Sequence, residues 1–373
     1  MKTSSNTGAF FALMRAGLWE KELRLSQFHP FDFDQVYQLT QEQSVFGLIT
    51  AGLEHVIDIQ IPKDVTLSFA RKTLRMEQRN NAMNHFLGVV VGRMREAGIN
   101  TILVKGQGVA QSYERPLWRT SGDVDFLLSD TDYRKAYDFL SPYASKIKKE
   151  DKEWKHQAMR IGPWEVELHG RLACSFSFKV NKVLNQIKYE TFCEGKVRSW
   201  FDDNVQIYLL REEYDILYVF VHFVNHFYKG GVGLRQICDW CRLLWKYRDT
   251  IDRQILASMI EQMGLMNEWK AFGAFAVEYL GMPVDAMPHY SVNKRLKKKA
   301  DRICSFILEV GNFGYNRDTS YYAKYPYLIR KAYSFGRRCK DLINHTLIFP
   351  LDTLRFFPVI MYNGFRSAMK GDG

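Results

Sequence analysis

The 373-residue sequence has few cysteines and no uninterrupted apolar run long enough to cross a membrane. Its most apolar late stretch, HTLIFPLDTLRFFPVIMY, contains Asp352, Arg355 and two prolines, whereas a spanning helix needs about 20 apolar residues. The N-terminal segment reaches charged residues without a long apolar core, so we expect that the chain is not exported. Six cysteines without a disulfide-rich spacing favour reduced thiols and a cytoplasmic protein.

Acidic residues are too few to balance the basic ones, and the formal net charge is +11. Such an excess favours anionic partners, including nucleotides, nucleic acid, phosphorylated glycans and acidic membrane surfaces. Much of the excess lies in residues 294–302 and 330–340, which are typical of solvated faces and carry no recognisable RNA-binding signature. Nucleic acid therefore stays an alternative partner that we do not favour. Peripheral membrane contact is a further alternative, because the apolar late stretch has basic neighbours.

Hydrophobic periodicity predicts an α+β fold in three parts. We expect an N-terminal helical region over residues 1–98, whose long last helix ends at Gly98. Residues 99–210 form the expected core, and residues 211–373 form a C-terminal helical domain with two antiparallel helices joined near residues 230–233. The core is expected to hold a small mixed β-sheet, backed by helices on one side, with strands near residues 100–104, 123–128, 145–148, 158–160, 164–168 and 206–209.

Two carboxylates interrupt one apolar strand of this core. Side chains two residues apart leave a strand by the same face, so Asp123 and Asp125 point together, about 7 Å apart. Like charges at this spacing repel and resist burial unless a cation lies between them. Mg²⁺ is the usual ion, because it prefers carboxylate oxygens and accepts phosphate oxygens as further ligands. Mn²⁺ is an alternative.

A third carboxylate comes from residues 164–168, WEVEL, where Glu165 and Glu167 share a face. We favour Glu167, which has apolar neighbours on both sides, and Glu165 stays the alternative. If this strand lies beside the Asp123 strand, about 4.8 Å separates the two backbones and Glu167 reaches the same cluster. Three carboxylates suit two metal ions in in-line phosphoryl chemistry. Glu167 can instead act as a general base.

The turn before the acidic strand is a candidate phosphate cradle. A strand that ends in Lys105-Gly106 and opens a helix presents free backbone N–H groups, and Gly106 allows a close approach. Lys105 or Arg119 can neutralise the departing pyrophosphate. The alternatives are that Lys105 is a surface charge and that Arg119 clamps Asp123 or Asp125.

The sequence resembles a poorly characterised bacterial family of the nucleotidyltransferase superfamily. Its signature is a Lys-Gly turn, an Arg before Asp-x-Asp and a later acidic-Leu-His segment. The matching residues are Lys105, Gly106, Arg119, Asp123, Asp125, Glu167, Leu168 and His169. The family typically has Asp where this chain has Glu167, and the wider superfamily has Gly-Ser where this chain has Gly106-Gln107. The resemblance covers the middle of the chain well and the helical flanks loosely.

The resemblance implies a polymerase-beta-like palm and the transfer of a nucleoside monophosphate from an NTP to a hydroxyl acceptor. The catalytic residues that it implies, which also hold Mg²⁺, are Asp123, Asp125 and Glu167. The nucleotide-binding residues that it implies are Lys105, Gly106, Gln107 and Arg119. The acceptor it favours is a small molecule or an intermediate of surface-polysaccharide biosynthesis. Nucleotidyl transfer to RNA or protein, as in toxin-like relatives, and a non-catalytic nucleotide-binding scaffold are the alternatives.

The C-terminal helices carry further candidates. His222 and His226 lie one helical turn apart, and we favour a packed or hydrogen-bonded pair over metal ligands because no third ligand is evident nearby. Arg235 and Asp239 have the spacing of an intrahelical ion pair. The resembling family has comparable helices here, so contact with nucleotide or acceptor is the alternative. His169 is expected to pack or hydrogen-bond behind the acidic strand.

Overall fold

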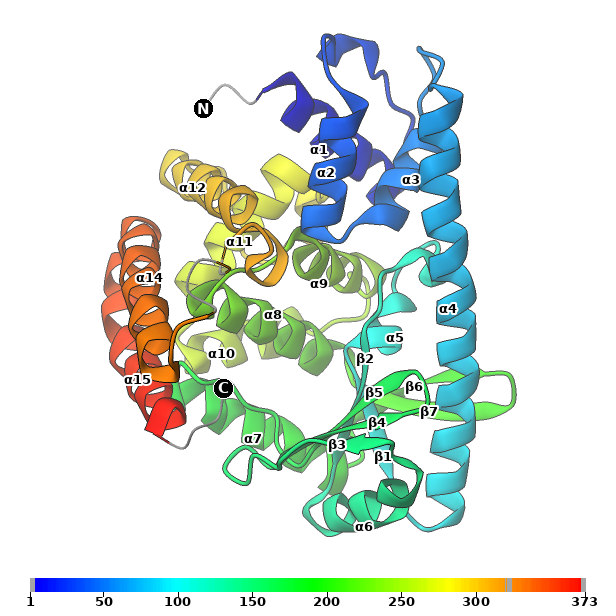
Figure 1. Cartoon of the computed structure of the whole chain (residues 1–373), viewed down its shortest axis with the longest axis vertical. Helices are drawn as coiled ribbons and strands as arrows, with labels where there is room; N and C mark the ends of the chain where they lie inside the picture. The colour runs from blue at the N-terminus through cyan, green and yellow to red at the C-terminus, as the bar shows by residue number, and fades with distance from the viewer. Residues whose placement is uncertain (1–3, 319, 321–323, 370–373) are drawn as a thin grey trace.

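The computed structural model describes residues 4–318, 320 and 324–369 (Figure 1). Helices surround one mixed β-sheet, so the predicted α+β class is confirmed. Figure 1 shows the sheet between the long helix α4 and the helices of the C-terminal half. Within the described part of the chain, no helix has both the length and the apolar character needed to cross a membrane.

Four helices precede the sheet: α1 (Ser5–Trp19), α2 (Phe33–Gln43), α3 (Phe46–Glu54) and α4 (Lys63–Glu96). The end of α4 follows the prediction. Gly98 adopts φ +72°, and the Ile99 N–H donates to the Met94 carbonyl oxygen. This is the left-handed cap that glycine favours, and it directs the chain into β1.

The sheet has seven strands in the order β3-β4-β5-β2-β1-β7-β6. They are β1 (Thr101–Val104), β2 (Asp123–Leu128), β3 (Lys146–Ile147), β4 (His156–Ile161), β5 (Trp164–His169), β6 (Val197–Asp202) and β7 (Val205–Leu210). The pairs β2–β5 and β1–β7 are parallel, and the other neighbours are antiparallel. The sequence did not predict β6, an edge strand without a buried residue, because its apolar alternation is weak.

Alternation along β2 gives the sheet two different faces. Val124, Phe126 and Leu128 are buried in an apolar cluster with residues of α4 and of α6 (Asp130–Leu140). Asp123 and Asp125 leave by the opposite face. Packing against α4 and α6 therefore holds β2 in place through one face of the sheet. The opposite face carries the two carboxylates.

The second half of the chain is largely helical. Its helices are α7 (Phe178–Cys193), α8 (Glu212–Lys229), α9 (Leu234–Lys246), α10 (Arg253–Met263), α11 (Met266–Leu280), α12 (Lys294–Val310), α14 (Tyr327–Ile348) and α15 (Pro350–Met369). The predicted junction at residues 230–233 separates α8 from α9. The predicted division of the chain into three parts, at residues 98 and 210, stays a prediction. The helix α4, which belongs to the N-terminal part, packs against the sheet of the central part.

Candidate active site

A cleft of about 880 Å³ lies between the sheet and α8, and the three predicted carboxylates line its sheet side. In the parallel pairing of β2 with β5, Asp123 lies opposite Glu165 and Asp125 lies opposite Glu167. Oxygens of Asp123, Asp125 and Glu167 all lie within 4.8 Å of one another. The structure therefore brings together the side chains that strand periodicity aligned.

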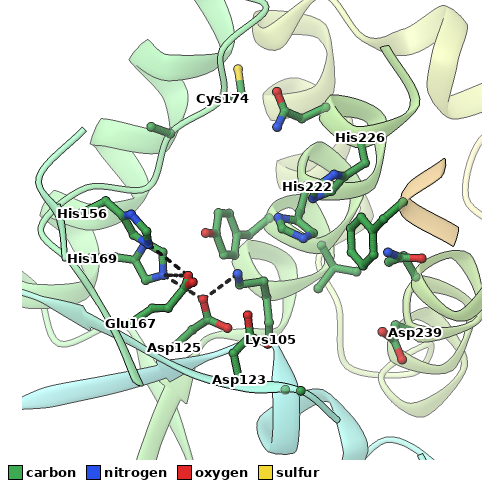
Figure 2. A pocket seen from close by; sticks show the side chains of 18 of the residues that line it. Lys105, Asp123, Asp125, His156, Glu167, His169, Cys174, His222, His226 and Asp239 are labelled. Carbon is green, nitrogen blue, oxygen red and sulfur yellow. Dashed lines mark hydrogen bonds and ion pairs between the residues drawn. The ribbon is translucent and has the colours of Figure 1, made fainter. Parts of the chain in front are cut away.

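Asp125 is the most buried member of this acidic cluster, with 1% of its surface exposed. Its Oδ1 is 2.7 Å from Lys105 Nζ and 2.7 Å from His169 Nε2 (Figure 2). Burial opposes the charge, but Lys105 and His169 hold the pKa of Asp125 below its usual value. Repulsion from Asp125, followed by burial, instead raises the pKa of Asp123. The cluster thus favours a nearby cation.

Glu167 lies between two histidines. Its Oε2 is 3.0 Å from His156 Nε2 and 3.5 Å from His169 Nε2 (Figure 2). Burial opposes ionisation, but the hydrogen bonds from both rings hold the pKa of Glu167 well below its usual range. A carboxylate of this kind is a weak proton acceptor and a good cation ligand. The alternative, Glu165, pairs with Lys148.

The turn before β2 packs directly against the acidic strand. Lys105 adopts φ +59° and Gly106 adopts φ +42°. A Cβ at Gly106 would lie 3.3 Å from the Asp123 carbonyl oxygen, so a larger residue there would be both strained and crowded. The helix that follows, α5 (Gly106–Ala110), has five residues and therefore a small dipole. Lys105 is no surface charge, because its side chain is 15% exposed and faces Asp125.

Gln107 is not among the residues that line the cleft. Its Nε2 donates to Asn84 Oδ1 on α4 at 2.8 Å, and its Oε1 accepts from Ser121 Oγ at 2.8 Å. Arg119 Nη1 in turn donates to Ser121 Oγ at 3.1 Å. The Gln107 side chain therefore orders the loop before β2, and its predicted contact with nucleotide stays a prediction.

The structure contradicts the alternative role considered for Arg119 and the ion pair suggested for Arg235. Arg119 does not clamp Asp123 or Asp125, because its guanidinium pairs with Asp239 of α9 at 2.7 Å. Asp239 is therefore not the partner of Arg235, whose Nη1 donates to the Thr120 carbonyl oxygen at 3.0 Å.

Arg235 lines the cleft next to Arg119, and Asp239 and Asp123 offset only part of its charge. Within the described residues it forms no ion pair with a carboxylate, and its buried Nε has no hydrogen-bond partner. Burial and the neighbouring Arg119 lower the pKa of Arg235. Both effects disfavour its positive charge, which an anionic ligand would offset.

Helix α8 forms the other wall of the cleft, with Tyr218, His222 and His226 among its lining residues. The two imidazole centroids are 4.6 Å apart, and that of His226 is 4.7 Å from the Phe313 ring. Burial, followed by the charge of Lys105, lowers the pKa of His226 to about 4 and that of His222 well below its usual range. Both rings are therefore neutral at pH 7, as the expected packed pair requires.

Sequence reasoning missed two kinds of lining residue. His156 lies opposite His169 in the pairing of β4 with β5, but the predicted strand began at residue 158. Extending its alternation back by two residues would have placed His156 on the cleft face. Asn312 and Phe313 follow α12, and no local pattern connects them with the acidic strands.

The profile of a family described as uncharacterised nucleotidyltransferase matches residues 29–281. The chain belongs to this nucleotidyltransferase family. The matched part contains every lining residue named above apart from Asn312 and Phe313. No curated protein and no solved structure matches the chain significantly.

The resemblance seen in the sequence is thus confirmed at the level of the nucleotidyltransferase family, which implies an NTP substrate. Nucleotidyltransferases usually depend on a divalent metal ion. In this member of the family the side chains that fit such an ion are the carboxylates of Asp123, Asp125 and Glu167, which converge at one wall of the cleft.

Proposed function

We propose that the protein transfers a nucleoside monophosphate from an NTP to a hydroxyl acceptor and releases pyrophosphate. The observation that carries this proposal is the convergence of Asp123, Asp125 and Glu167 in a cleft of about 880 Å³, a volume within the range of small-ligand sites. A polymerase-beta-like palm is part of the proposal, and the family match together with the placement of the three acids supports it.

The donor set of the acidic cluster fits a hard cation, because it consists of carboxylate oxygens within 4.8 Å of one another. When bound there, two Mg²⁺ ions, or Mn²⁺ in their place, would neutralise phosphate oxygens and lower the pKa of the acceptor hydroxyl. Lys105, now 2.7 Å from Asp125, is placed to donate to the triphosphate, and Gly106 lets it approach the turn.

The chemistry is an in-line displacement. The acceptor oxygen forms a bond to the α-phosphorus while the bond from that phosphorus to the bridging oxygen breaks, and pyrophosphate leaves with the electron pair. The lowered pKa of Glu167 makes it a poor general base, so we assign the hydroxyl proton to solvent water and a ligand role to Glu167.

The two arginines have different proposed roles. Arg235 lines the cleft and its buried Nε has no hydrogen-bond partner among the described residues, so we assign it to the phosphates of the NTP. Arg119 lines the cleft as well, but its pairing with Asp239 makes it chiefly a positioning residue. The predicted nucleotide contact of Arg119 is therefore limited to the part of its guanidinium that Asp239 leaves accessible.

The proposed acceptor is a small molecule or an intermediate of surface-polysaccharide biosynthesis, with RNA or protein as the alternative. The sequence resemblance favours the small-molecule or polysaccharide acceptor over RNA or protein. A cytoplasmic site of action, where NTPs are made, belongs to the same proposal.

One contact favours a second candidate function, a non-catalytic nucleotide-binding scaffold. The Lys105 ammonium is 2.7 Å from Asp125, where it already supplies part of the positive charge that a metal would bring. If Lys105 keeps this place when a nucleotide binds, the cleft holds the nucleotide without chemistry.

Pyrophosphate release tests the two candidates. The full chain is incubated with each NTP, Mg²⁺ and a small-molecule extract, and Asp123→Ala and Asp125→Ala are compared with Asp138→Ala, an exposed carboxylate on α6. If the protein transfers nucleotide, we expect it to release pyrophosphate only when metal is present. Asp123→Ala and Asp125→Ala should abolish this release, and Asp138→Ala should retain it. Nucleotide binding without release in any extract would support the scaffold. Labelling from α-³²P-NTP, treated with nuclease, protease or glycosidase, then separates the acceptor classes.

A further inference from the structure

Two histidines on neighbouring strands enter the cleft beside the acidic cluster. His156 on β4 and His169 on β5 are paired in the antiparallel register, so their side chains leave by the same face. Their ring centroids are 4.9 Å apart with an interplanar angle of 37°. Figure 2 shows both rings directed at Glu167.

The rings present equivalent atoms to one point. Nε2 of His156 and Nε2 of His169 lie 3.0 and 3.5 Å from the same oxygen of Glu167. The His169 Nε2 also lies 2.7 Å from Asp125 Oδ1, so a metal bound by His169 would replace that contact. Ligand atoms of these three residues all lie within 4.8 Å of one another, as those of the acidic cluster do. Glu167 belongs to both groups. Two imidazoles and a carboxylate form the donor set of many transition-metal sites.

We propose that Glu167 separates the cleft into two unlike metal positions. One is the all-oxygen position of Asp123, Asp125 and Glu167, which would hold the Mg²⁺ ions of the proposed function, and the other is a position formed by His156, Glu167 and His169. The second position binds a first-row transition ion, such as Mn²⁺, Co²⁺ or Zn²⁺, in preference to Mg²⁺. This inference rests on the proposed function for the all-oxygen position, because both positions share Glu167.

Donor chemistry gives the second position its preference. Mg²⁺ demands oxygen ligands, keeps several waters and dehydrates reluctantly. Imidazole nitrogen is a softer donor that suits transition ions, whose affinity for nitrogen sites rises from Mn²⁺ to Cu²⁺ and is lower again for Zn²⁺. Mg²⁺ alone should therefore fill the all-oxygen position and leave the two imidazole rings without a metal.

Pulsed electron paramagnetic resonance of bound Mn²⁺ tests this assignment, because it detects nitrogen ligands directly. The probe is Mn²⁺ added to the untagged full chain in excess Mg²⁺, which competes for the all-oxygen position. We expect one retained Mn²⁺ per chain with coupling to imidazole nitrogen. His156→Gln and His169→Gln should each weaken Mn²⁺ binding about tenfold or more and reduce the nitrogen coupling. His85→Gln, an exposed residue of α4, is the matched control and should change neither.

Different failures have different meanings. Mn²⁺ that binds without nitrogen coupling would overturn the histidine position and leave the acidic site intact. Unchanged binding and coupling in His156→Gln, which keeps a hydrogen-bond donor for Glu167, would show that the histidine only orients the carboxylate. No bound Mn²⁺, with or without Mg²⁺, would overturn both this inference and the metal site of the proposed function. The wild-type spectrum decides the question even if a variant does not fold.

Discussion

Arg119 and Asp239 form a bidentate ion pair across 120 residues of sequence. Nε and Nη2 of Arg119 lie 2.7 Å from Oδ1 and Oδ2 of Asp239, and both side chains are buried. The Tyr113 hydroxyl donates to the same carboxylate at 2.7 Å. The pair connects the loop before β2 with α9, so it fixes the helical wall of the cleft relative to the acidic strand.

We expect Asp239→Ala to lower the free energy of unfolding by about 3–5 kcal/mol, because it leaves Arg119 buried without its counter-charge. Urea unfolding followed by circular dichroism measures this change. The double variant Arg119→Met/Asp239→Leu should be more stable than Asp239→Ala, since neither charge remains. Arg134→Ala, which breaks an exposed pair with Asp138, should change stability by about 0.5 kcal/mol or less. A loss below about 1 kcal/mol for Asp239→Ala would contradict this role.

Asp123→Asn should stabilise the metal-free protein at pH 7. Repulsion from Asp125 and burial raise the pKa of Asp123, so the folded state keeps this proton to a higher pH than the unfolded chain does. The stability that Asp123 contributes is thus present at low pH and lost as the pH rises through its folded pKa. We expect the melting temperature to rise by about 1–2 °C in EDTA at pH 7.

The same variant should respond differently to metal. Mg²⁺ is expected to raise the melting temperature of the wild type but not that of Asp123→Asn, because the variant lacks one ligand. A wild type and variant that melt alike with and without Mg²⁺ would argue against both the repulsion and the metal site.

Arg235→Gln should weaken the binding of NTP without lowering the stability of the fold. The free energy of unfolding should not fall, because burial and Arg119 already disfavour the charge. Affinity for NTP should fall about tenfold, the equivalent of one lost charge-assisted hydrogen bond. Calorimetric titration with NTP measures the affinity, and Arg134→Gln, on the exposed face of α6, is the control. Unchanged affinity would remove Arg235 from the phosphate site.

The half-buried histidines of α8 should make the protein sensitive to acid. The pKa of His226 is about 4 in the folded state, against an ordinary 6.5, and that of His222 is lowered as well. Between about pH 6.5 and pH 4 the unfolded chain therefore binds protons that the folded chain does not, and stability falls as the pH falls. Urea unfolding in EDTA at pH 7 and pH 5 should show a smaller loss for His226→Gln than for the wild type. An equal loss would contradict the burial of a neutral His226.

The sequence predicted the acidic half of the cleft because that half follows from local rules. Strand periodicity placed Asp123 with Asp125 and Glu165 with Glu167, and the family resemblance together with its apolar neighbours favoured Glu167. The Lys105-Gly106 turn followed from the glycine that comes after the first strand of the core. Each of these inferences needs a few neighbouring residues and one assumption, that β2 and β5 are adjacent, which the structure confirms.

The helical wall could not be predicted in the same way. The i, i+4 spacing suggested Arg235 as the partner of Asp239, but that rule describes a marginal interaction on a helix surface. A buried bidentate contact from Arg119 replaces it, and no local pattern connects the loop before β2 with α9. Phe313 reaches His226 for a similar reason, through packing between segments distant in sequence.

The proposed reaction requires Asp123, Asp125 and Glu167 to hold divalent metal against the phosphates of an NTP. A crystal structure with Mn²⁺ and an α,β-methylene NTP, phased with anomalous data at the manganese edge, tests it most directly. We predict an anomalous peak within about 2.0–2.3 Å of carboxylate oxygens of Asp123 and Asp125, next to the α-phosphate, with Lys105 turned toward the triphosphate. An ordered nucleotide whose phosphates lie elsewhere, with no peak at these carboxylates and Lys105 still paired with Asp125, would contradict the account.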